Sequence, residues 1–239
     1  MYKIAFITDL HIPEDLKPKE GIPVYENFLW ALETAGKYLP DLIIIGGDLC
    51  YDKGDITIMK LVKEQLDQTG IEYYVIPGNH DDSLMLAEVF NYTTEGNKIK
   101  PYNIFKEGFE LSFLDSADYT VYLPHLQSAL SSKSPQKIIF VHHPLTIGGN
   151  VFMDNYHKLY NHEENYAYLK SIDVNAYFFH GHYHTHYFST FNKLKFFITP
   201  STFYQIDPLS PTFMIASEKP AFNLIQLNNE GLSSTIIYR

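Results

Sequence analysis

The sequence predicts an α/β fold in which two sheets of mixed strands form a β-sandwich flanked by helices. Short apolar runs typical of strands alternate with longer segments of helical periodicity over most of the chain. After residue 186 the helical segments stop and only strand-like runs separated by turns remain. With 239 residues, 45% of them hydrophobic, the chain can build a large core. We therefore expect a single domain over residues 1–239, with a C-terminal β-hairpin region at about 186–239.

The first half predicts three strands, each followed by a helix. The strands are expected at residues 3–8, 41–45 and 72–76, and the helices at residues 24–38, 55–69 and 83–90. Asp55 is the expected N-cap of the second helix, and Asp82 with Ser83 caps the third. Each strand runs directly into a polar motif.

The second half predicts another sheet. Strands at residues 110–114, 137–141 and 176–179 alternate with helices at residues 123–130 and 161–170. One hairpin is expected from residues 187–191 and 195–198, and another from residues 222–227 and 233–238, turned by residues 228–231.

Composition excludes several classes of protein. The formal net charge of −10 argues against a sequence-independent nucleic-acid binder, although bound cations would reverse the field locally. No apolar run approaches the roughly 20 residues that cross a bilayer. Cys50 is the single cysteine, which excludes an intramolecular disulfide and favours a buried, unreactive thiol. A strand that begins almost at Met1 leaves no room for a secretory signal, so we expect a cytoplasmic protein.

Five predicted strands end in side chains that can bind a metal. They are Asp9 and His11, Asp48, Asn79 and His80, His142, and His182 and His184. Carboxylate, amide and imidazole donors without a thiolate suit Mn, Fe, Zn or Co. The carboxyl ends of strands are also where α/β sheets place their ligand sites. A metal centre is therefore predicted at this edge.

Several of these residues allow another interpretation. An isolated Asp after a strand more often caps the next turn, but the ordered set here favours metal ligands at Asp9 and Asp48. His143 either supports the centre or faces the substrate. His180 and His186 either face the pocket or belong to the sheet. The remaining histidines, expected at the solvated surface, are His125, His157 and His162.

These motifs carry a family resemblance. Asp9-x-His11, Gly47-Asp48, Gly78-Asn79-His80-Asp81, His142 and Gly181-His182-x-His184 together resemble the ordered motif set of the calcineurin-like metallophosphoesterases. The resemblance covers nearly the whole chain and implies the αββα fold of that superfamily. Three further segments are similar to bacterial class III 3′,5′-cyclic-AMP phosphodiesterases: Phe152-Met153-Asp154, Leu159-Tyr160-Asn161, and residues 199–205.

The resemblance implies a role for each motif residue. One metal would be held by Asp9, His11 and His184, the other by Asn79, His142 and His182, with Asp48 bridging them. Two cations about 3.5–4 Å apart can share a hydroxide that attacks a phosphodiester.

The resemblance also implies residues that act on the substrate. His80 would protonate or stabilise the leaving oxygen, and Asp81 would fix its orientation. Substrate contacts are expected from His143, Asn161 and Tyr204.

The expected activity is hydrolysis of 3′,5′-cyclic AMP to AMP, with Mn, Fe or Zn as cofactors. A glycerophosphodiesterase or a broad-specificity phosphoesterase would use the same metal chemistry. A protein phosphatase usually has Glu where Asp81 stands. A non-catalytic scaffold on this fold would typically lack ligands or His80, which are all present. The expected partner is a small phosphodiester, without nucleic acid or membrane, and a homodimer is possible.

Overall fold

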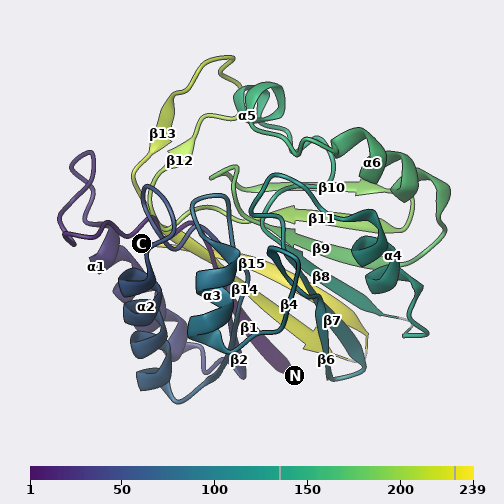
Figure 1. Ribbon diagram of the computed structural model, residues 1–239, viewed down its shortest axis with the longest axis horizontal. Coiled ribbons are helices and arrows are strands. Elements are labelled where there is room, and N and C mark those ends of the chain that lie inside the picture. Colours follow the sequence, from purple (N-terminus) through teal and green to yellow (C-terminus); the bar gives the residue numbers. More distant parts are fainter. Residues whose placement is uncertain (135, 229) are drawn as a thin grey trace.

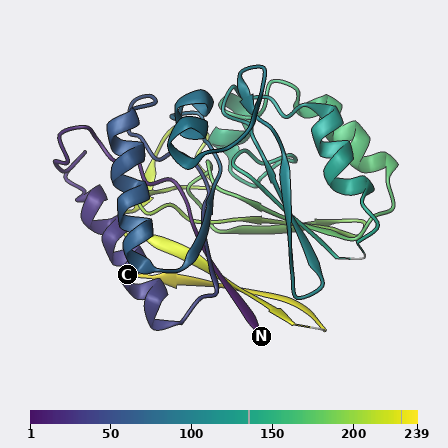
Figure 2. The ribbon, with the colours of Figure 1, turned by 60° about the horizontal axis from the view of Figure 1, so that its bottom comes forward.

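Two stacked sheets form the centre of the molecule, and helices cover both outer faces (Figures 1 and 2). The computed structural model describes residues 1–134, 136–228 and 230–239. The predicted α/β sandwich of mixed sheets is confirmed. Among the described residues, no helix has the length and apolar character needed to cross a bilayer.

The first sheet joins the two ends of the chain. Its strand order is β15-β14-β1-β2-β3, where β1, β2 and β3 run parallel and β14 pairs antiparallel with β1. Ile4 on β1 lies opposite Ile225 on β14, so the C-terminal hairpin extends the sheet from the N-terminal strand. The strands are β1 (Tyr2–Ile7), β2 (Leu42–Ile45), β3 (Glu72–Val75), β14 (Ala221–Asn228) and β15 (Gly231–Tyr238).

The second sheet has the order β10-β11-β9-β8-β7-β6. Its four central strands, β11, β9, β8 and β7, run parallel, and an antiparallel strand closes each edge. The strands are β6 (Tyr102–Lys106), β7 (Phe109–Leu114), β8 (Lys137–Val141), β9 (Ala176–His180), β10 (Tyr187–Phe191) and β11 (Leu194–Ile198).

The core between the sheets is largely aromatic. Phe140 on β8 contacts Phe6 on the first sheet at a ring-centroid distance of 5.3 Å, and both side chains are fully buried. Phe113 and Phe179 pack against the same ring, each at 5.5 Å. Successive strand side chains point to opposite faces, so neighbouring residues such as Ile139 face the outer layer instead.

The outer layers are helical. Helices α1 (Val24–Lys37), α2 (Ile56–Thr69) and α3 (Ser83–Phe90) cover the first sheet, and α4 (Leu123–Ser131) and α6 (His162–Ser171) cover the second. Asp55 caps α2 by accepting hydrogen bonds from the amides of Thr57 and Ile58, as predicted. Asp82 caps α3 in the same way.

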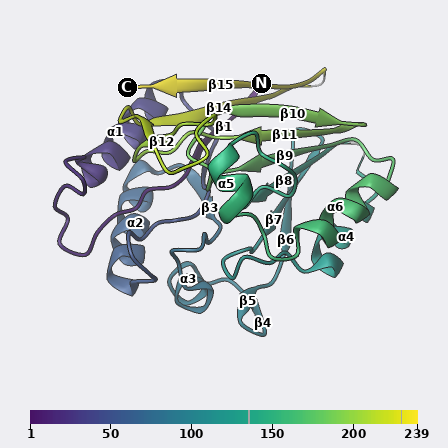
Figure 3. The ribbon, with the colours of Figure 1, turned by 90° about the horizontal axis from the view of Figure 1, so that it is seen from above.

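A separate layer covers the edge at which the parallel strands end. It consists of helix α5 (Val151–Tyr156) and the small hairpin of β12 (Gln205–Ile206) and β13 (Ile215–Ser217). Viewed from above, α5 and β12 lie over this edge of the sheets (Figure 3). We call α5 and this hairpin the overhang.

Several elements differ from the sequence predictions. The strand β6, the overhang and the two-residue strands β4 (Thr94–Glu95) and β5 (Lys98–Ile99) were not predicted. These segments are short, and their backbone pairing depends on tertiary contacts. The predicted turn at residues 228–231 includes residue 229, which lies outside the described residues.

The aromatic core makes a testable prediction. Phe140→Ala should lower the free energy of unfolding by about 3–5 kcal/mol, because it leaves a cavity between the sheets. Phe105→Ala on β6, where the ring is 69% exposed, is the matched control and should change it by less than about 0.5 kcal/mol. Urea unfolding followed by circular dichroism measures both. Equal losses would contradict the assignment of Phe140 to the core.

Candidate metal centre

The loops after five parallel strands meet at one edge, and backbone hydrogen bonds tie them together. The amide of Asp9 donates to the carbonyl of Gly47 at 3.0 Å, and that of His11 to Asp48 at 2.9 Å. Between the loops of the second sheet, the amide of Gly181 donates to the carbonyl of His142 at 3.1 Å. The seven predicted ligands therefore approach one another from both sheets.

Much of this edge has left-handed backbone. The φ angles of five predicted ligands fall between 46° and 65°, a region that costs free energy for residues other than Gly. The five are Asp9, His11, Asp48, His182 and His184. Such strain persists where the surrounding structure holds it in place, and its concentration at five predicted ligands is consistent with a functional site.

Two motif glycines are required by close approach. A Cβ atom at Gly78 would lie 2.2 Å from Oδ1 of Asp48, and one at Gly181 would lie 2.6 Å from Oδ2 of Asp9. Neither position has a positive φ, so the constraint is space and not backbone conformation. Any side chain there would displace a predicted ligand.

The first group of ligands contains Asp9, His11 and His184. Their ligand atoms lie within 4.8 Å of one another, and the Nε2 atoms of the two imidazoles are 3.0 Å apart. His184 Nδ1 donates to the carbonyl of Tyr204, so its Nε2 carries the free lone pair. The group therefore presents one carboxylate and two imidazoles to a common point.

The second group contains Asp48, His142 and His182. His142 Nδ1 donates to the carbonyl of Gly46 at 2.7 Å, which leaves Nε2 as the atom that would bind a metal once its proton is lost. His182 Nε2 donates to the carbonyl of His157 at 2.8 Å, which leaves Nδ1. Each backbone carbonyl thus selects the tautomer and orientation needed for metal binding.

Unpaired atoms support a cation in this second group. His142 Nε2 lies 3.2 Å from Oδ2 of Asp48 but is not aligned for a hydrogen bond with it. Oδ1 of Asn79 is also buried without a hydrogen-bond partner. Buried polar atoms are rarely left unsatisfied, and the imidazole and amide donors of these two residues suit the same borderline metals as the Asp48 carboxylate. The residues present therefore fit a bound cation.

Asp48 lies between the two groups. Its carboxylate belongs to the second group and also lies 3.7 Å from His11 Nε2 of the first. This position suits the bridging role that the family resemblance implies for Asp48.

Electrostatics favours the protonation states that bind metal at Asp9, Asp48, His11 and His182, but not at His142. Burial alone would raise the pKa values of Asp9 and Asp48, but the neighbouring charges of His184 and His142 outweigh it and lower both. Burial lowers the pKa of His11 and of His182 to about 3. At His142 the carboxylates outweigh burial and raise the pKa to about 9. Without metal, the carboxylates stay ionised and His142 alone of these three imidazoles holds a proton that a metal must displace.

The predicted partner of His80 needs correction. The carboxylate of Asp81 does not contact the His80 ring; it accepts hydrogen bonds from the amides of Gly78, Leu49 and Cys50. His80 Nδ1 instead donates to the carbonyl of Tyr51 at 2.5 Å. Asp81 therefore joins the loops after β2 and β3, because its carboxylate accepts the backbone amides of both loops.

The three expected substrate contacts occupy different places. Tyr204 lines the cavity beside the ligands. His143 is fully buried next to the His182 ring at 4.1 Å and does not line the cavity. The Asn161 amide exchanges hydrogen bonds with the backbone of Val121 and lies outside the cavity lining.

Two of the histidines outside the motifs differ from expectation. His162 is buried at 5% exposure and His157 is half-buried beside the cavity, so neither is a solvated surface residue. His180 is buried against Phe178 on the outer face of the second sheet. His186 is exposed and does not line the cavity.

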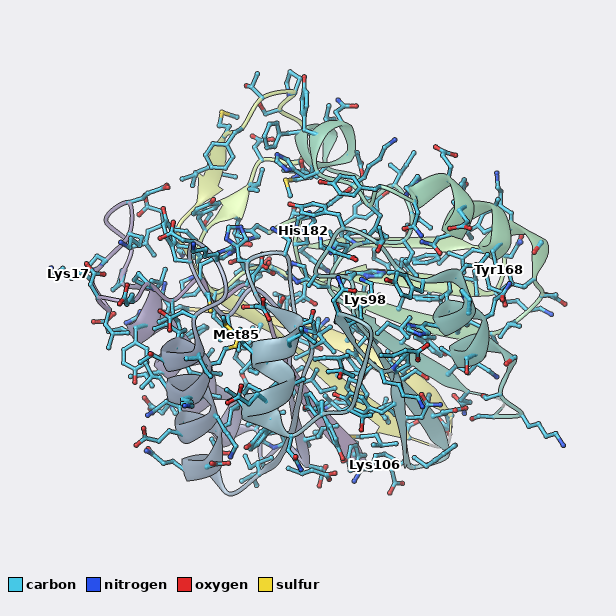
Figure 4. The ribbon with its side chains drawn as sticks, viewed as in Figure 1. Lys17, Met85, Lys98, Lys106, Tyr168 and His182 are labelled. Carbon is cyan, nitrogen blue, oxygen red and sulfur yellow. The ribbon has the colours of Figure 1, made fainter. Side chains whose placement is uncertain are left out.

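A cavity of about 400 Å³ opens over the ligands. Figure 4 labels His182, one of the ligands that line it, below the overhang. Most of the other residues that line the cavity were not predicted from the sequence to do so. They are Tyr51, Asp52, Tyr119, Phe152, Met153, His157, Phe203, Ile206 and Phe213. Only the family-like segments around Phe152 and Phe203 offered a signal for them.

Comparison with known proteins agrees with this geometry. Residues 2–186 match the family model described as calcineurin-like phosphoesterase. A Fibrobacter succinogenes protein named as a probable cyclic nucleotide phosphodiesterase is 31% identical over 240 residues, covering 99% of this chain and 93% of that protein. A Nostoc protein named as a 3′,5′-cyclic-nucleotide phosphodiesterase is 27% identical, covering 99% and 91%.

A solved structure supports the fold. The structure of a dimetal phosphatase from Danio rerio superposes with a TM-score of 0.67 at 14% sequence identity, covering 99% of this chain and 98% of that one. The family resemblance of the motifs and the predicted fold are both confirmed.

The close approach at Gly78 makes a testable prediction. Gly78→Ala should weaken metal binding by about 10–100-fold, because its methyl group displaces the Asp48 carboxylate. Gly36→Ala in helix α1, where a Cβ meets nothing within 4 Å, is the matched control and should bind metal normally. Calorimetric titration with Mn²⁺ measures both variants. Unchanged affinity in a folded Gly78→Ala protein would contradict the proposed position of Asp48.

Proposed function

Because this chain is a metal-dependent phosphodiesterase that belongs to the calcineurin-like phosphoesterase family, we propose that it hydrolyses 3′,5′-cyclic AMP to AMP. The observation that carries the proposal is that Asp48 lies between two groups of candidate ligands beneath a cavity with aromatic walls. Relatives that match nearly the full chain and are named for cyclic nucleotides support this substrate class.

The cavity needs cations to bind a phosphate. No Lys or Arg occurs among the described residues that line it, and its carboxylates, Asp48 and Asp52, would repel an anion. Two cations held by the ligand groups would offset the phosphate charge and lower the pKa of a water molecule that they share. We propose Mn, Fe or Zn, since carboxylate, amide and imidazole donors suit all three.

His80 is the proposed acid for the leaving oxygen. The carbonyls of Tyr51 and Asp52 accept from Nδ1 and fix the ring, which leaves Nε2 for the substrate. The ring lies at the cavity wall, 4.8 Å from that of His11. Nε2 would donate a proton to the ribose oxygen as its bond to phosphorus breaks.

The state of the single cysteine bears on the cellular compartment of the protein. Burial raises the pKa of the Cys50 thiol, so this cysteine is an unreactive core residue and needs no oxidising environment. We propose a cytoplasmic enzyme that acts on a small phosphodiester. The homodimer stays a prediction.

Turnover of 3′,5′-cyclic AMP by Mn-loaded protein tests the substrate. We expect efficient hydrolysis to AMP, measured by chromatography beside bis(p-nitrophenyl) phosphate and glycerophosphodiesters. Asn79→Ala should abolish turnover of every substrate, because it removes a ligand from one site. Cleavage of the activated diester or of glycerophosphodiesters without cyclic AMP would reject the proposed substrate and keep the chemistry.

The acid role of His80 makes a separate prediction. His80→Ala should reduce kcat for cyclic AMP by about 10²–10⁴-fold, because its alkoxide leaves poorly without a proton. Bis(p-nitrophenyl) phosphate, whose nitrophenolate needs no proton, should lose far less. An equal loss on both substrates, with metal content unchanged, would reject the acid role.

A further inference from the structure

A series of cavity-lining side chains leads from one predicted metal ligand to another through the overhang. Its members, in order, are His184, Tyr204, Phe213, Phe152, His157 and His182. Neighbouring ring centroids from His184 to His157 lie 5.0–5.9 Å apart. The last step is the hydrogen bond from His182 Nε2 to the carbonyl of His157. We call Tyr204, Phe213 and Phe152 the aromatic wall.

The aromatic wall is built from separate parts of the overhang. Phe152 belongs to α5, Phe213 lies in the segment between β12 and β13, and Tyr204 directly precedes β12. Phe213 is 47% exposed although it lines the cavity, and it meets Phe152 and Tyr204 edge-on. Exposed aromatic surface inside a cavity marks a place that an apolar ligand group would cover.

We infer that the aromatic wall binds the nucleobase while the phosphate binds at the metal centre. This inference rests on the proposed function, which places a nucleotide in the cavity. Tyr204 connects the two regions, since its carbonyl orients His184 and its ring packs against Phe213. Every nucleobase can stack on an aromatic side chain, whatever its pattern of hydrogen-bond donors and acceptors.

The wall selects for a planar ring and not for one particular base. Among the described lining residues of the overhang and its immediate neighbours, only His157 and Tyr204 carry side chains that can form hydrogen bonds; Phe152, Met153, Ile206 and Phe213 are apolar. A glycerol group offers no flat surface to this wall. The overhang therefore favours nucleoside phosphodiesters over glycerophosphodiesters.

Binding of AMP and ribose 5-phosphate to Mn-loaded protein tests the wall without turnover. Both ligands carry the same phosphate and sugar, and only AMP has a base. Calorimetry should show AMP binding at least about 10-fold more tightly, a ratio that Phe213→Ala reduces by about 10-fold. Phe213→Tyr should keep the ratio because it keeps the ring. Leu209→Ala, which changes an 82% exposed side chain outside the cavity lining, should keep it as well.

The outcomes separate this inference from the proposed function. Equal binding of AMP and ribose 5-phosphate by the unchanged protein, or an equal loss of both in Phe213→Ala, would overturn the inference. If cyclic AMP is not hydrolysed but the binding ratio still depends on Phe213, the wall is supported and the cyclic substrate alone is rejected. If cyclic AMP is hydrolysed but the ratio of AMP to ribose 5-phosphate affinity does not change in Phe213→Ala, the wall is rejected and the activity is supported.

Discussion

The burial of two carboxylates side by side is the constraint on which the rest of this site depends. Asp9 is fully buried and Asp48 nearly so, and both remain ionised because imidazoles surround them. Like charges removed from water repel one another strongly unless a cation or a dense set of polar partners compensates them. The left-handed backbone, the carbonyl that orients each of His142, His182 and His184, and the absence of a side chain at Gly78 all hold ligands around that charge. Bound cations would therefore complete a site whose local strain the rest of the fold maintains.

This arrangement makes the chemistry depend on the packing of the two sheets. Asp9, Asp48 and Asn79 follow strands of the first sheet, whereas His142, His182 and His184 follow strands of the second. The ligand groups combine residues from both, so a shift of one sheet against the other would separate them. The rings around Phe140 fill the space between the sheets at van der Waals contact and resist such a shift. The aromatic core thus acts as a positioning element for the metal centre.

The sequence was informative where strand and motif coincide. Alternating apolar runs located most of the strands, and the polar residues that follow them lie together at one edge of the sheets. Long-range contacts could not be read in this way. Asp81 follows His80 directly in the sequence. Its carboxylate nevertheless accepts hydrogen bonds from backbone amides of the loop after β2, which lies about 30 residues away in the chain. Asn161 lies in a family-like segment, but its side-chain amide donates a hydrogen bond to the backbone carbonyl of Val121 and not to the cavity. Phe213 meets Phe152 from a distant segment, and nothing distinguished Phe213 among 17 Phe residues.

The metal centre and the overhang differ in how much change they tolerate. The ligands sit on strand ends tied by backbone hydrogen bonds, where even a methyl group at Gly78 would collide with Asp48. The overhang consists of a six-residue helix and very short strands, so few backbone hydrogen bonds fix its shape. Changing a ring there alters one wall of the cavity and leaves the ligands where they are. Replacing the aromatic wall is therefore a route to new substrates on this fold, whereas the strand ends keep the hydrolytic chemistry constant.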